Sequence, residues 1–211
     1  MAQRNIFLGV LLLCVVFVVA GCKTIPTQTP SDTIATTIIT DPAVNPISAS
    51  ADNFNILGRI SISDKDQSFS GSFRWRHSEK IDEILLFTPL GQAVAEITRD
   101  SDGVRLITSK LEAFYAENVE YLTEEVLGWR LPLNGLQYWI QGAHSPITSA
   151  EKDLAQNNQL IAIRQDGWSI HYARFVVDKS RPTPMPKLFH LYYDNERLKI
   201  RVIVDEWNVK Y

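Results

Sequence analysis

The sequence predicts a mostly β protein, with one antiparallel sheet interrupted by two short helices. Apolar and polar residues alternate with a period of two in many short segments from Phe54 onward. Polar turn residues separate these segments. Between Val119 and Gly142 the alternation stops and apolar residues recur at helical spacing. Residues 51–211 are therefore expected to form one domain of about ten strands and two helices.

The first predicted hairpin runs from Phe54 to Arg76. Its two arms alternate cleanly, and Asp64-Lys65-Asp66-Gln67 supplies a polar turn between them. Such alternation indicates that one face of the hairpin is buried and the other is in water. Further strands are predicted at 81–88, 93–99, 103–108 and 111–116, with a turn at 100–103.

Two amphipathic helices are predicted next. The first carries apolar residues at i, i+3 and i+7 from Val119 and ends at Gly128; the second begins at Pro132 and ends at Gly142. Both are too short to be stable alone, so their apolar stripes must lie on the sheet. The last strands are predicted at 160–164, 168–177, 186–193 and 197–205.

A curved sheet with helices across its open side encloses a space. The apolar stripes of the strands and helices predict that seven side chains line it: Phe73, Trp75, Leu86, Val126, Leu133, Leu136 and Ile140. These patterns leave open whether the space is solid core, which is the general rule for protein interiors, or a ligand cavity.

The first 22 residues predict a lipoprotein signal. Arg4 precedes an apolar run of about 15 residues, which is short for a membrane-spanning helix, and Val19-Ala20-Gly21-Cys22 ends it as a lipobox. We expect cleavage before Cys22, acylation of that cysteine with palmitate or a similar chain, and loss of residues 1–21. Because Lys23 follows instead of an aspartate, the sorting convention of Gram-negative bacteria predicts an outer-membrane location.

Residues 22–50 are predicted to be the lipidated cysteine and a flexible tether. The segment is rich in Pro and Thr and has no strand or helix period, so it cannot offset its ordering entropy by burial. A free tether of this length reaches about 30 Å. A short helix over 43–53, with Pro46 in its first turn, is left open.

Charge and composition exclude several classes of function. The net charge is −3, becoming −4 once Arg4 is removed, with no basic block for nucleic acid. Cys22 would be the only cysteine of the mature chain, so no internal disulfide is expected. The four histidines lack metal-site spacing, and no nucleophile elbow or phosphate loop occurs. We therefore expect no catalytic residues, no metal and no cofactor.

One connection between strands does not fit a simple turn. Pro89-Leu90-Gly91 places a large aliphatic residue between two turn-forming residues. The residues alone leave two orientations open: Leu90 is either tucked onto the domain or presented outward.

Several segments behind the lipobox, taken in their order and spacing, resemble the LolB family of outer-membrane lipoproteins. They are LGRIS at 57–61, FRW at 73–75, LLFTPLG at 85–91, LGWRLPL at 127–133, LQYWIQG at 136–142, and LKI at 198–200 with Trp207. The resemblance implies an unclosed antiparallel β-barrel, here of about ten to eleven strands, with a helical lid over a hydrophobic cavity. It also implies that Pro89, Leu90 and Gly91 form a protruding membrane-insertion loop.

The function implied by this resemblance is that of a monomeric receptor at the periplasmic face of the outer membrane. It would accept acylated client lipoproteins from a LolA-like periplasmic carrier and insert them into outer-membrane lipid. Two alternatives are kept: an assembly lipoprotein with a solid core that binds another envelope protein, and a lipid-acting hydrolase.

Overall fold

The computed structural model describes residues 26–31, 33–42, 52–177, 183–193 and 197–207. The predicted signal peptide, Cys22 and most of 43–53 lie outside these residues. No helix in the described ranges is long and apolar enough to cross a membrane.

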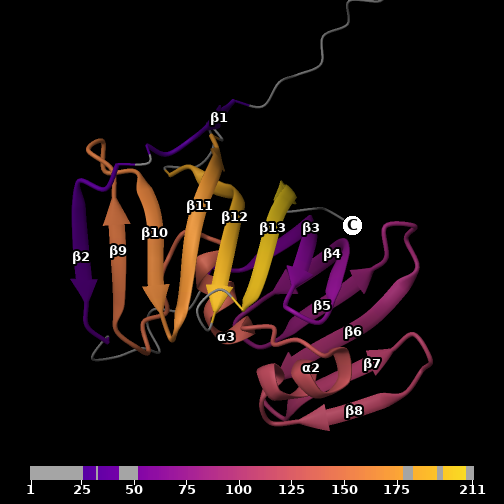
Figure 1. Cartoon of the computed structure of the whole chain (residues 1–211). Helices are drawn as coiled ribbons and strands as arrows, with labels where there is room; N and C mark the ends of the chain where they lie inside the picture. Colours follow the sequence, from indigo (N-terminus) through magenta and orange to yellow (C-terminus); the bar gives the residue numbers. More distant parts are fainter. Residues whose placement is uncertain (1–25, 32, 43–51, 178–182, 194–196, 208–211) are drawn as a thin grey trace, which may run out of the picture.

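The described residues form one antiparallel sheet of thirteen strands, with two helices between β8 and β9 (Figure 1). The first half of the domain contributes β3 (Phe54–Ser63), β4 (Ser68–His77), β5 (Asp82–Phe87), β6 (Ala93–Asp100), β7 (Gly103–Thr108) and β8 (Ala113–Ala116). The helices are α2 (Val119–Leu127) and α3 (Leu133–Trp139). The second half contributes β9 (Ala150–Leu154), β10 (Leu160–Gln165), β11 (Trp168–Val176), β12 (Met185–Tyr193) and β13 (Leu198–Trp207). Two strands precede the domain: β1 (Thr27–Gln28) and β2 (Thr36–Thr40).

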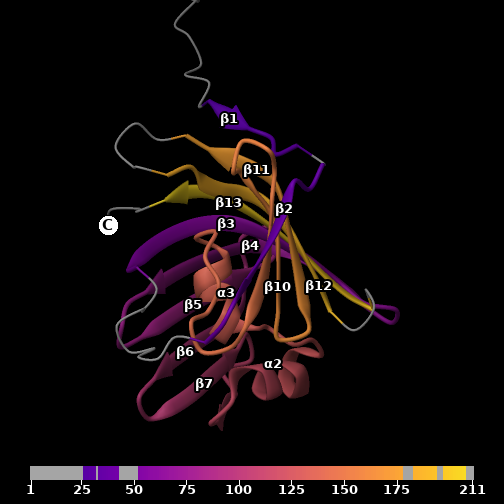
Figure 2. The same ribbon diagram turned by 90° about the vertical axis from the view of Figure 1, so that its left-hand side faces the viewer.

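The sheet is strongly curved and does not close. Its order is β2-β9-β10-β11-β12-β13-β3-β4-β5-β6-β7-β8, with β1 on β11. Among the described residues, the outermost strands β2 and β8 do not pair with each other. Figure 2 shows α3 inside the curve, between the β3–β6 half and the β10–β12 half. The predicted fold class, a mostly β, unclosed antiparallel half-barrel with two helices, is confirmed.

The concave face is apolar because the strands alternate as predicted. Buried positions recur every second residue along β3, β5 and β13. Gly58 pairs with Phe73, and a Cβ added at Gly58 would lie 2.4 Å from the carbonyl oxygen of Ile203 and 2.6 Å from the Phe73 ring. Glycine here lets the aromatic ring cover the neighbouring backbone.

Three strands were not predicted, namely β1, β2 and β9. β9 contains Glu151, Lys152 and Asp153 and therefore lacks an apolar alternation. β8 is also shorter than expected: the predicted strand 111–116 begins only at Ala113, and Leu111 lies in the preceding turn.

The expected tether over 22–50 requires a correction in its described part. β2 pairs with β9 over its whole length, and Thr37 donates a hydrogen bond to Asp153 at 2.7 Å. Arg164 binds the same carboxylate and that of Glu151. Hydrogen bonding from Arg164 lowers the pKa of Asp153, so this carboxylate stays charged in the fold. A sequence without a hydrophobic period can still join a sheet, because an edge strand gains its backbone hydrogen bonds from its neighbour.

Hydrogen exchange would check the attachment of β2. The amide of Ala35 donates to the carbonyl of Leu154 at 2.8 Å, so we expect it and the paired amides of 36–40 to exchange more slowly than in a free chain. Arg164→Ala removes the charged partner of Asp153 and should speed exchange in β2, while amides of β3 and β4 remain protected. Free-chain exchange of 36–40 in the parent protein would support the flexible tether instead.

Candidate functional site

The seven side chains predicted to line one apolar space meet between the sheet and the helices. Phe73 and Trp75 lie on β4, Leu86 pairs with Phe73 from β5, and the other four lie on α2, on α3 and directly after it. Six of the seven are buried in a single apolar cluster, and Val126 packs against it. The structure thus brings these residues together; their contact with acyl chains remains a prediction.

Local signals define the two helices that cover this cluster. The side chain of Asn118 caps α2 by accepting a hydrogen bond from the Tyr121 amide at 2.9 Å. α2 ends at Gly128, which has a φ of 86°. Between the helices, the amide of Leu131 donates to the buried hydroxyl of Thr123 at 3.0 Å. This bond holds the chain close to α2 before Pro132 starts α3.

Buried polar contacts hold the C-terminal end of α3 against the second half of the sheet. The Trp139 indole donates to Gln165 at 3.0 Å, and the Tyr172 hydroxyl donates to the Trp139 carbonyl at 2.8 Å. The side-chain amide of Gln165 donates in turn to the backbone carbonyl of Ser145 at 2.8 Å. Burial raises the pKa of Tyr172 well above its ordinary value, so its hydroxyl stays protonated and can donate.

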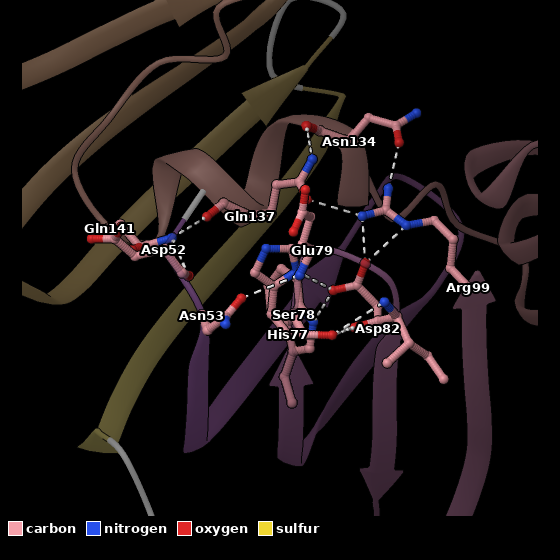
Figure 3. Close-up of polar contacts among 12 residues, drawn as sticks. Asp52, Asn53, His77, Ser78, Glu79, Asp82, Arg99, Asn134, Gln137 and Gln141 are labelled. Atoms are coloured by element: carbon pink, nitrogen blue, oxygen red, sulfur yellow. Dashed lines mark hydrogen bonds and ion pairs between the residues drawn. The ribbon is translucent and has the colours of Figure 1, made fainter. Parts of the chain in front are cut away.

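A charged network holds the other side of α3 against the first half of the sheet (Figure 3). Asp82, whose side chain is 3% exposed, accepts hydrogen bonds from Trp75 and His77, both at 2.7 Å, and from Arg99. Arg99 also donates to the side-chain oxygens of Asn134 and Gln137 on α3. A single buried carboxylate therefore orients the arginine that holds the helix.

The electrostatics of Asp82 follow from these partners. Burial alone would raise its pKa, but hydrogen bonding from His77 and the charge of Arg99 outweigh it, and the pKa lies below its ordinary value. Asp82 is therefore ionised throughout the neutral range.

The hairpin that carries Leu90 presents it outward. The amide of Gly91, with φ 83°, donates to the carbonyl of Thr88 at 2.9 Å, and the amide of Thr88 donates to the carbonyl of Gln92 at 2.8 Å. These bonds define a tight turn, and Leu90 at its tip is 89% exposed. Of the two orientations that the sequence left open, the outward one is found; insertion into a membrane remains a prediction.

Some features of this site were not predicted. The network of Asp82 and Arg99 includes residues of α3 that are far away in the sequence. The one signal in the sequence is that Asp82 begins β5 and Arg99 lies near the end of β6, so that the two face each other in an antiparallel pair. A cleft of about 680 Å³ beside it is lined by His77, Asp82, Arg99, Gln137 and Tyr138, among others. Within the described ranges, no three His, Cys, Asp or Glu side chains gather as a metal site.

Comparison with known proteins gives one consistent family. Residues 52–207 match the family model described as outer membrane lipoprotein LolB. The outer-membrane lipoprotein LolB of Nitrosomonas europaea is 41% identical over 98% of this chain and 93% of its own length. Those of Thiobacillus denitrificans and Chromobacterium violaceum are 36% and 32% identical, covering 74% and 94% of this chain and 81% and 97% of their own.

Replacement of Asp82 by Asn tests the charged network. At neutral pH we expect Asp82→Asn to lower the free energy of unfolding by about 2 kcal/mol, because charge-assisted hydrogen bonds inside the fold are lost. The pKa of Asp82 is lower in the folded than in the unfolded state, so its contribution is present above about pH 4, the ordinary value. This contribution to stability is lost as the pH falls through the pKa of Asp82 in the folded state.

The measurement is chemical denaturation of the parent and the variant across the acid range. The difference between the two should narrow as the pH falls below about 4, because the unfolded parent then binds a proton at Asp82 that the folded parent does not yet bind. A difference that stays constant with pH would show that the Asp82 charge does not stabilise the fold.

Proposed function

The chain belongs to the LolB family of outer-membrane lipoproteins, and on this premise we propose that it receives acylated lipoproteins from a LolA-like periplasmic carrier and inserts them into the outer membrane. The observation that carries the proposal is the apolar interior between the concave sheet face and α2 and α3. Apolar surfaces bind acyl chains. Because the sheet does not close, this interior is bounded on its open side by the helices.

The energetics of transport explain why such a receptor is needed. Burying an acyl chain gains about 0.8 kcal/mol per methylene, so exposing a chain of about 16 carbons to water costs on the order of 10 kcal/mol. A client must therefore pass from one apolar environment to the next. In this proposal the acyl chain passes from the carrier to the interior of the receptor and then to the bilayer. Its free energy in each environment is no higher than in the one before.

The lining residues are buried in this structure, so the proposal requires movement of an element that covers them. Phe73, Trp75 and Leu86 are almost fully buried, in one apolar cluster with residues of α2 and α3. α3 is short and is held by the polar contacts described above, to Gln165, Tyr172 and Arg99. We infer that α3 acts as the lid, because its displacement would uncover the cluster without breaking the sheet.

The anchor belongs to the same proposal. The lipobox predicts that Cys22 carries the lipid and keeps the receptor at the outer membrane, where delivery takes place. The central test is a transfer assay: an acylated client, loaded on the carrier, should move to this protein and then to liposomes. Failure of the first transfer would favour the assembly-lipoprotein alternative.

Binding of an apolar fluorescent dye would test the interior. We expect the mature chain with Cys22→Ala to bind the dye and fatty acids to displace it, because pockets of this kind are recognised mainly through apolar contact. A water-soluble head-group analogue without an acyl chain should displace none. A protein that binds neither dye nor acylated client would have a permanently filled core, contrary to the proposal.

Leu90→Glu would test the insertion loop. Because Leu90 is exposed, we expect the free energy of unfolding to change by no more than about 0.5 kcal/mol. The glutamate would oppose entry of the loop into acyl chains, so the variant should accept a client from the carrier but fail to deliver it to liposomes.

The matched control is Gln156→Glu, which places the same charge in the exposed turn between β9 and β10. This control should deliver its client normally. Normal delivery by Leu90→Glu, or a melting temperature far below that of the parent, would refute the role of Leu90 in insertion.

A further inference from the structure

A second leucine is exposed at a hairpin tip in this domain. Leu111 lies in the turn between β7 and β8 and is 86% exposed, nearly as much as Leu90. Its φ is 65°, one of three positive values among the described residues that are not glycine. The other two are Asn158 and Asp166, residue types that tolerate this conformation.

The turns that carry Leu90 and Leu111 share one backbone geometry. The amide of Leu111 donates to the carbonyl of Thr108 at 2.9 Å, as that of Gly91 does to Thr88. The amide of Thr108 donates to the carbonyl of Glu112 at 3.0 Å, which repeats the bond from Thr88 to Gln92. Leu111 therefore occupies the left-handed position that Gly91 fills in the first turn, and glycine is the usual residue there.

Leucine at this position costs the fold energy that glycine would not. A left-handed conformation is unfavourable for a residue with a Cβ, which crowds the neighbouring carbonyl oxygen. The side chain recovers little of this cost by packing, since it is mostly in solvent. Strain that the fold does not require is a reason to look for a function.

The two leucines lie at the same end of the sheet. Strands β5 to β8 are consecutive neighbours, so the β5–β6 and β7–β8 turns are two strand spacings apart, about 10 Å. The amide of Ser109 donates to the carbonyl of Val94 at 3.0 Å and ties the second turn to the start of β6. Both turns project from the right-hand edge of the domain in Figure 1.

The opposite ends of the same strands are polar. The β4–β5 turn contains Ser78, Glu79 and Lys80, and the β6–β7 turn contains Ser101 and Asp102. Exposed leucines are thus confined to one end of this part of the sheet. Lys110, exposed beside Leu111, has an aliphatic stem and an ammonium group that suit the boundary between acyl chains and anionic head groups.

We propose that Leu90 and Leu111 together form a two-point contact with the lipid bilayer, with Leu111 as a second insertion residue. The inference rests on the proposed function and extends it. One inserted side chain leaves the domain free to turn about the contact, whereas two define a line. The edge formed by β5 to β8 is then held in one orientation to the membrane while a client leaves the interior.

A fluorescent probe at each tip tests the contact. In the mature, lipidated chain Cys22 has no free thiol, so a cysteine introduced at Leu90, Leu111 or Ser101 can be labelled alone. The labelled protein is placed in vesicles of phosphatidylethanolamine and phosphatidylglycerol with brominated acyl chains. We expect quenching at positions 90 and 111 and none at position 101, which lies in the opposite turn.

The outcomes separate this inference from the proposed function. Quenching at 90 without quenching at 111 would overturn the second contact and leave the Leu90 loop intact. Quenching at neither tip would refute both the Leu111 contact and membrane insertion of the Leu90 loop. Equal quenching at 111 and 101 would mean that the domain lies on the membrane without a preferred edge, and this also overturns the proposal.

Leu111→Gly provides an independent test, because it removes the side chain and relieves the strain. The melting temperature should stay the same or rise. Delivery of a client to these vesicles should slow about tenfold, as expected for one leucine that no longer enters the bilayer. Uptake from the carrier should not change, and Leu111→Met should deliver normally.

Normal delivery by Leu111→Gly would overturn the proposal. A melting temperature well below that of the parent would also overturn it, since Leu111 would then stabilise the fold itself.

Discussion

The structure depends on mutual burial of two apolar surfaces that are unstable alone. The concave face of the sheet presents Phe73, Trp75 and Leu86, and the helices present Leu133 and Leu136. Neither helix is long enough to be stable in water, and the sheet cannot leave such a face exposed. Because the sheet does not close on itself, α2, α3 and the segments next to them, with Trp129, Leu131 and Ile140, pack against this face. The same arrangement that stabilises the fold supplies the interior that, in the proposed function, opens when α3 moves.

Polar contacts give this cover a defined position. An apolar interface resists separation but sets orientation weakly, whereas hydrogen bonds are directional. Arg99 and Gln165 bind α3 from opposite halves of the sheet. The carboxylate of Asp82 keeps Arg99 in place, and Asp82 is itself held by Trp75 and His77. These few contacts would break when α3 moves, and their number is small enough for a bound acyl chain to offset their loss.

The exposed leucines show the opposite use of apolar residues. Interior positions bury leucine to stabilise the fold, whereas Leu90 and Leu111 contribute almost no buried area. Both are set on tight turns of paired strands, so they are presented rigidly. The lipid anchor predicted at Cys22 keeps the domain at the membrane, and a rigid apolar tip can then act over a short distance. In the described part of the predicted tether, β1 and β2 join the sheet.

Local patterns in the sequence determined the strands with clean alternation, the two helices and the Leu90 turn, since each depends on neighbours within a few residues. They also indicated the seven apolar residues of the interior. Only the tertiary structure decided the features that rest on distant partners. β2 and β9 lack a hydrophobic period and form by pairing with neighbouring strands. Arg99 meets Asn134 and Gln137 across the curve of the sheet, and Leu111 aligns with Leu90 through strand order. The predicted strand 111–116 included Leu111, but its backbone is left-handed, a conformation that leucine seldom adopts and that becomes visible only in the folded backbone.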